Sequence, residues 1–99
     1  MKRYTPIYLW EPTQPGESLL GTHAGYENVK TSHGVQKAIL IKTHCGIIYK
    51  LSLSKGLQTI IARIDVRLTD RIRINYQGKR TGKDGRQFHA HQVLRGANA

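Results

Sequence analysis

The amino-acid sequence predicts a small all-β domain with one short helix. Its 99 residues suffice for a single domain, and 38% hydrophobic residues with ten glycines are typical of short strands joined by many turns. The clearest local signal is the alternation of apolar and polar residues in two runs, 71–77 and 87–93, on either side of a glycine-rich loop. One segment, 54–67, departs from the strand pattern toward helical spacing.

The N-terminal third of the chain is expected to hold an extended arm, one strand and a loop. Residues 1–16 contain all three prolines, which favour an extended conformation. Residues 17–26 predict a first strand, in which Gly21 and Gly25 indicate a bulge or sharp bend. Such a bend would let one strand serve two sheets. The polar run 27–36 is interpreted as a loop.

The middle of the chain predicts a hairpin followed by a helix. The apolar runs 37–43 and 47–53 flank Cys45-Gly46, a tight turn. In segment 54–67, Ser54 is a candidate N-cap, and an apolar stripe at positions i, i+3, i+4 and i+7 favours a helix. The run IIARIDV within it is also compatible with a strand, so that alternative stays open.

The last two expected strands form a long hairpin around the loop 78–86. Ile72, Ile74 and Tyr76 share one face, and Arg71 and Arg73 lie on the other. Tyr76, like Tyr49 among its apolar neighbours, is therefore expected in the core.

The predicted order is three strands, a helix and two strands, which is typical of the OB-fold, a five-stranded Greek-key barrel. The domain would span residues 17–95, between the N-terminal arm 1–16 and a tail, 96–99. In this fold the face around the second and third strands binds oligonucleotides, together with the loops 27–36 and 78–86 in this chain. Loop 78–86 carries Lys79, Arg80, Lys83 and Arg86 against one acid, Asp84. Its positive charge therefore indicates the same face as the fold does, with Lys42 and Lys50 on its floor.

Two runs of sequence resemble a known family. They are W-E-P-x-x-P-G-E-x-L-x-G at 10–21 and D-R-I-R-I-N-Y-Q-G-K-R-x-G-K-x-G-R-x-F-H-x-H-x-V at 70–93. Both are similar to runs in small phage-encoded OB-fold proteins, which resemble single-stranded-DNA-binding proteins. The resemblance extends over most of the chain, from 10 to 93. It implies an OB barrel with a non-enzymatic DNA-binding role.

The charge of the chain favours a polyanionic partner. Sixteen Lys and Arg residues stand against six Asp and Glu residues, which gives a net charge of +10. A small domain this basic typically binds nucleic acid. The expected nucleic-acid-binding residues are Tyr26, Lys30, Lys42, Lys50, Arg71, Arg73, Lys79, Arg80, Lys83, Arg86, Phe88, His89 and His91.

Within this set, the rings of Tyr26 and Phe88 are the candidates for stacking on bases. His89 and His91 share one strand face at a spacing that can chelate a metal, but no acid or cysteine nearby completes a site. We therefore expect no metal and no cofactor, and interpret both histidines as polar surface beside the loop.

The chain is expected not to be an enzyme, because its carboxylates are scattered and no nucleophile motif is present. Three alternatives stay open: a small basic RNA-binding module, a metal-independent ribonuclease of the toxin type, and an OB-fold protein–protein adaptor. The expected partner is single-stranded DNA, with RNA and a homodimer left open. The single cysteine, Cys45, excludes an intrachain disulfide, and no apolar run is long enough to span a membrane, so we expect a cytoplasmic protein without membrane contact.

Overall fold

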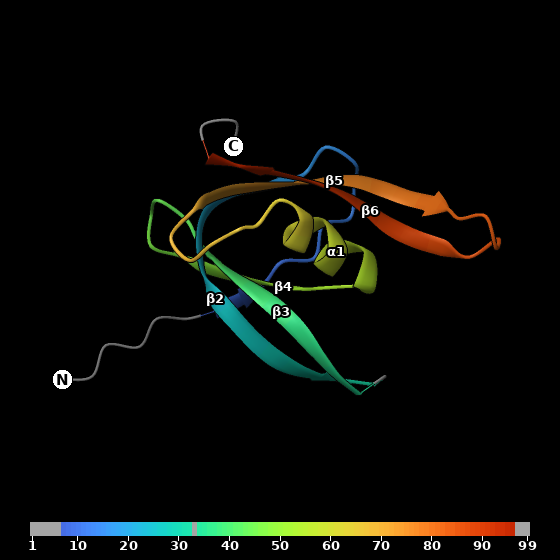
Figure 1. Ribbon diagram of the computed structural model, residues 1–99, viewed down its shortest axis with the longest axis horizontal. Coiled ribbons are helices and arrows are strands. Elements are labelled where there is room, and N and C mark those ends of the chain that lie inside the picture. The colour runs from blue at the N-terminus through green and yellow to red at the C-terminus, as the bar shows by residue number, and fades with distance from the viewer. Residues whose placement is uncertain (1–6, 33, 97–99) are drawn as a thin grey trace.

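The computed structural model describes residues 7–32 and 34–96 and places six strands in a single sheet. The spatial order of the strands is β1-β4-β3-β2-β5-β6 (Figure 1). The prediction of an all-β fold with one short helix is confirmed. In chain order the elements are β1 (Ile7–Leu9), β2 (Ser18–Thr31), β3 (Gly34–Lys42), β4 (Ile48–Ser52), α1 (Lys55–Arg63), β5 (Arg71–Thr81) and β6 (Gln87–Arg95).

The sheet is open, and it has one strand more than expected. Residues 7–9 of the predicted arm form β1, which pairs in parallel with β4 through Ile7↔Ile48 and Leu9↔Lys50. Because β1 occupies this edge of β4, β4 and β6 are not neighbours and the sheet does not close on itself. Residues 1–6 of the arm and 97–99 of the tail lie outside the described residues.

Strand β2 pairs with β5 and β3 within one sheet, whereas the sequence predicted a strand that serves two sheets. Its first part pairs with β5 and its second part with β3, and both pairings meet at Thr22. The register shifts between His23 and Gly25, and Gly25 has φ +125°, a conformation that favours glycine. At Gly21 a Cβ atom would lie 2.5 Å from the carbonyl oxygen of Lys42, so only glycine allows this close approach.

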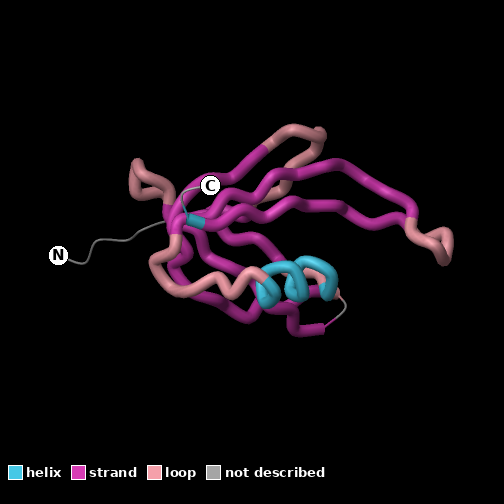
Figure 2. Tube along the Cα trace, turned by 45° about the horizontal axis from the view of Figure 1, so that its top comes forward, coloured by secondary structure: helices cyan, strands magenta, loops and turns pink. Residues whose placement is uncertain are grey.

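The two long hairpins project from the core and diverge, with α1 between them (Figures 1 and 2). The prediction of a loop at 27–36 is wrong, because β2 and β3 stay paired as far as Thr31↔Gly34. Likewise β5 continues to Thr81, which leaves 82–86 as the connection. Most side chains at residues 27–30 of β2 are exposed. The sequence there therefore shows no apolar alternation, although the backbone is paired with β3.

The helical interpretation of segment 54–67 is confirmed over its first part, and the strand alternative is wrong. Ser54 is the N-cap, and its Oγ accepts a hydrogen bond from the Leu57 N–H at 3.2 Å. Leu57 and Ile61 are buried against the sheet. The helix ends at Arg63, and Asp65 has φ +54°, which a continuing helix does not permit.

The core lies on the concave side of the sheet under α1. Ile39, Ile41, Ile72 and Ile74 are fully buried there, and each contributes about 1.5–3 kcal/mol relative to exposure. Tyr76 is 4% exposed, so its prediction as a core residue is confirmed. Tyr49 is partly buried and packs against the same cluster.

Candidate nucleic-acid interface

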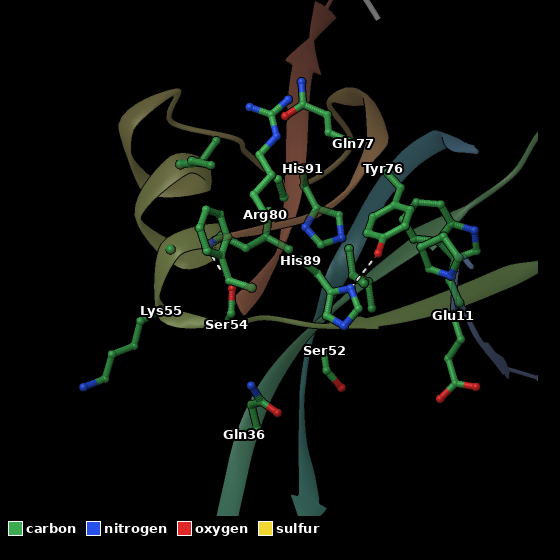
Figure 3. A pocket seen from close by; sticks show the side chains of 18 residues that line it. Glu11, Gln36, Ser52, Ser54, Lys55, Tyr76, Gln77, Arg80, His89 and His91 are labelled. Carbon is green, nitrogen blue, oxygen red and sulfur yellow. Dashed lines mark hydrogen bonds between the residues drawn. The ribbon is translucent and has the colours of Figure 1, made fainter. Parts of the chain in front are cut away.

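A cavity of about 990 Å³, called the groove below, lies beside the start of α1 (Figure 3). Its volume is at the upper end of the range of ligand-binding pockets. Residues 10–12, which follow β1, contribute to its lining, as do residues of β3, β4, the start of α1 and the hairpin β5–β6. The groove therefore collects side chains from both halves of the sheet.

One wall of the groove is a cluster of rings around Tyr76. The Tyr76 hydroxyl oxygen lies 2.6 Å from His89 Nδ1 in a hydrogen bond (Figure 3). The Tyr76 ring centroid is 5.6 Å from that of His89 and 5.4 Å from that of His91, and Trp10 lies 6.5 Å from His91. His91 pairs directly with Tyr76 across the strands, whereas His89 follows a register shift at Gly78. Three elements of the chain thus build one cluster of flat side chains.

Burial lowers the pKa of His91 below its ordinary value. A hydrogen bond with the His89 backbone opposes this shift, and the nearby charge of His89 adds to it. At neutral pH the His91 imidazole is therefore uncharged and offers a flat, weakly polar surface to the groove.

Two cationic side chains, Lys55 and Arg80, line the groove from opposite elements, α1 and β5. Both residues are exposed. Glu11 is the only acid among the described lining residues, and in Figure 3 it lies on the far side of the groove from Lys55. Neither cation forms an ion pair within the described part of the chain. The groove thus combines rings with net positive charge.

The structure brings four of the thirteen predicted residues into the groove, namely Arg80, Phe88, His89 and His91. Lys79, Lys83 and Arg86 are exposed at the end of the β5–β6 hairpin, where Arg86 lies 3.7 Å from Asp84. Lys30 is exposed on the β2–β3 hairpin.

Tyr26 lies outside the groove and is partly covered. Tyr26 is 42% exposed, Lys37 Nζ lies 4.2 Å from its ring centroid, and the His23 ring packs edge-on with its centroid 4.8 Å away. Burial raises the pKa of the Tyr26 hydroxyl.

Neither Lys42 nor Lys50, the residues expected on the floor of the binding face, lines the groove. Lys50 is half-buried, and its Nζ lies 3.7 Å from a carboxylate oxygen of Glu27. Lys42 and Arg71 line a second depression at the bend of β2. Arg73 lies two residues beyond Arg71 on β5, and its Nε is buried without a hydrogen-bond partner.

Sequence reasoning missed several groove residues, chiefly Trp10, Gln36 and Lys55. Trp10 is held beside the groove by its backbone N–H, which donates to the backbone carbonyl of Lys50 at 2.9 Å, a contact between residues far apart in sequence. Gln36 lies in the segment that the sequence predicts as a loop, but it is part of β3, and its side-chain Nε2 donates to the Leu53 carbonyl at 3.0 Å. Lys55 could have been found, since it directly follows the predicted N-cap.

In the described ranges, no group of three or more His, Cys, Asp or Glu residues is placed to hold a metal ion. None of the described helices has the length and apolar character that crossing a membrane requires. Comparison with known proteins finds no matching family model, no matching curated protein and no matching solved structure. The resemblance to phage OB-fold proteins therefore depends on the runs at 10–21 and 70–93 alone.

Proposed function

We propose that the protein binds single-stranded nucleic acid in the groove, with single-stranded DNA as the ligand and little dependence on base sequence. The observation that carries this proposal is that a single cavity combines flat rings with unpaired cations. Phe88, Trp10 and His91 can stack on bases, while Lys55 and Arg80 can contact phosphates. Binding of single strands without sequence preference needs this combination.

The order of the elements supports the proposal. Strands β2, β3 and β4, the helix α1, and strands β5 and β6 follow the order of an OB-fold, which is a partly open barrel. In that assignment, the ends of the two long hairpins correspond to the loops that frame the binding face. The groove is lined by β3 and β4 on one side and by the β5–β6 hairpin on the other. β1 is an addition to this framework.

The proposed mechanism is phosphate neutralisation with release of counterions, supplemented by stacking. Each stacked base contributes about 1–3 kcal/mol. If about 5 phosphates are contacted, the logarithm of the affinity falls with the logarithm of salt concentration at a slope near −3.5. A duplex should bind more weakly, because its bases are already stacked and cannot reach the rings.

The test is a titration of labelled single-stranded DNA, duplex DNA and RNA of one sequence at several salt concentrations. We expect the single-stranded DNA to bind most tightly with a steep salt slope. Affinity for the duplex equal to that for the single strand, or a flat salt response, would contradict the proposal.

A second candidate function is metal-independent cleavage of RNA, and one observation favours it. Tyr76, His89 and His91 lie within one cluster, beside Lys55 and Arg80, and these groups can transfer protons and hold a phosphate without a metal. RNA incubated with the protein and a chelator separates the two functions. A binder leaves the RNA intact, whereas a nuclease produces fragments and loses this activity in the His91→Ala variant.

A further inference from the structure

A second depression, of about 440 Å³, lies at the bend of β2. Residues 20–22 of β2 form one side, and Lys42, Thr43 and His44 form another. Arg71, the first residue of β5, completes the lining. None of these lining residues is acidic. The depression therefore presents two permanent positive charges together with hydroxyl and imidazole groups.

The strand register places Lys42 and Arg71 on the same side of the sheet, on either side of Thr22. Thr22 is opposite Lys42 on β3 and also opposite Arg71 on β5. Directly opposed residues share a face, with Cβ atoms about 5 Å apart, so the Cβ atoms of Lys42 and Arg71 are about 10 Å apart across Thr22. Both side chains are long enough for their charged ends to contact one small anion above the threonine.

No carboxylate neutralises this pair within the described residues, because neither Lys42 nor Arg71 takes part in an ion pair there. The acid nearest in sequence, Asp70, accepts the backbone N–H of Arg67 at 2.9 Å. Like charges on either side of Thr22 repel each other. An anion between them would remove this repulsion.

Arg73 adds a third positive charge on the same face of β5. It is opposite Leu20, one of the residues that line the depression. Its Nε is buried and has no hydrogen-bond partner, a state that is costly in folded proteins. The positive potential of the depression is therefore higher than Lys42 and Arg71 alone would produce.

We propose that this depression is a phosphate-binding site, and that it holds a backbone phosphate of the same strand whose other nucleotides occupy the groove. That this phosphate belongs to the strand bound in the groove depends on the proposed function. Gln36 lines the groove and Lys42 lines the depression, so about 20 Å of β3 separates the two. A stacked strand covers this distance in about 6 nucleotides. A ligand of about this length or longer can engage both sites, and this length lies within the range of OB-fold site sizes.

The test compares the wild type with a Lys42→Gln/Arg71→Gln double variant. Both residues are exposed, so the fold should persist, and circular dichroism checks this. The control is Arg63→Gln, which removes one exposed positive charge at the end of α1, outside the groove and the depression. Each protein is titrated with DNA of about 4 and about 20 nucleotides.

We expect the Lys42→Gln/Arg71→Gln variant to bind the long DNA about tenfold more weakly and the short DNA as the wild type does. For the long DNA its salt slope should fall by about 0.7, the loss of one phosphate contact. The control should change both affinities little and equally. Equal loss for the short and the long DNA, or no loss for either, overturns the bridging of the two sites.

Titration with inorganic phosphate, followed by amide NMR, tests the depression independently of nucleic acid. We expect shifts at Thr22 and Lys42 in the wild type and none in the double variant. Phosphate shifts without a length-dependent effect mean that the depression takes free phosphate and not the strand. If the wild type binds no DNA at all, the proposed function fails, and the phosphate titration still decides the site. Absence of phosphate shifts overturns the site itself.

Discussion

Replacement of Phe88 by alanine should weaken binding of single-stranded DNA without destabilising the protein. The Phe88 side chain lines the groove, is 49% exposed and lies outside the core cluster, so its truncation leaves no internal cavity. Loss of one stacked base costs about 1–3 kcal/mol, which corresponds to a 5- to 150-fold weaker affinity. The slope of affinity against salt concentration should not change, because no phosphate contact is lost.

The assay is fluorescence anisotropy with a labelled oligothymidine at fixed salt. Phe88→Leu keeps the apolar character but removes the ring, so it should lose nearly as much affinity as Phe88→Ala. Val35→Ala is the matched control, since Val35 is another exposed apolar residue, on β3 and outside the groove. Affinity of Phe88→Ala within twofold of the wild type would refute stacking on Phe88. A steeper or flatter salt slope would show that the truncation had disturbed the cations instead.

Three further predictions concern charge, pH and packing. Charge reversal at four cations of the β5–β6 hairpin should abolish binding of single-stranded DNA; the four are Lys79, Arg80, Lys83 and Arg86. Circular dichroism should show an intact fold. Wild-type affinity in this variant would place the binding site elsewhere. His23 is 3% exposed, and burial lowers the pKa of its imidazole. As the pH drops below about 6.5, His23 therefore binds a proton in the unfolded chain before it does so in the folded protein. The free energy of unfolding should fall in this range, by at most about 1.4 kcal/mol per pH unit for this residue. Urea titrations between about pH 5 and 7 measure this fall, and His23→Gln should reduce its slope, leaving the contribution of His91; an unchanged slope would exclude His23 as its source. Gly21→Ala should destabilise by about 1–3 kcal/mol, because the new Cβ would lie 2.5 Å from the Lys42 carbonyl oxygen; an unchanged urea midpoint would mean that β2 and β3 can separate at no cost.

The parts of the fold that could be predicted are those where one face of an element is buried. Ile72, Ile74 and Tyr76 alternate with polar residues, and all three are buried as the period-two pattern requires. Leu57 and Ile61 identified the buried stripe of α1 for the same reason. In each case the core imposes a period on the sequence.

Because only a buried face imposes such a period, the sequence of residues 27–36 indicates a loop. The β2–β3 hairpin extends beyond the core, so water reaches both of its faces and the sequence has no period. Backbone pairing such as Lys30↔Val35 continues there, but it leaves no mark on the choice of side chains. Strand β1 is not predicted by the sequence, because its three residues pair with Ile48–Lys50. A partner so far away in the sequence cannot be identified from local sequence.

The sequence predicts which kinds of residue form the candidate site, but not which of them lie together in the folded protein. Alternation assigns Lys42 and Arg71 to strands, but the sequence does not specify which strands are neighbours at the bend of β2. The register through Thr22 joins these two cations and separates them from Arg80 and the groove. Of the thirteen residues predicted as one interface, four therefore line the groove and two line the depression.

The segment between β1 and β2 connects the open sheet to the groove. It begins where the Trp10 N–H donates to the Lys50 carbonyl at 2.9 Å and ends where the Gly16 N–H donates to the Tyr76 carbonyl at 2.8 Å. It thus crosses from β4 to β5, between the strands on either side of the cavity. Because β1 occupies the edge of β4, this segment and not a closing strand fills that gap, and it brings the Trp10 ring to His91. The feature that keeps the sheet open is therefore also the source of the tryptophan in the groove.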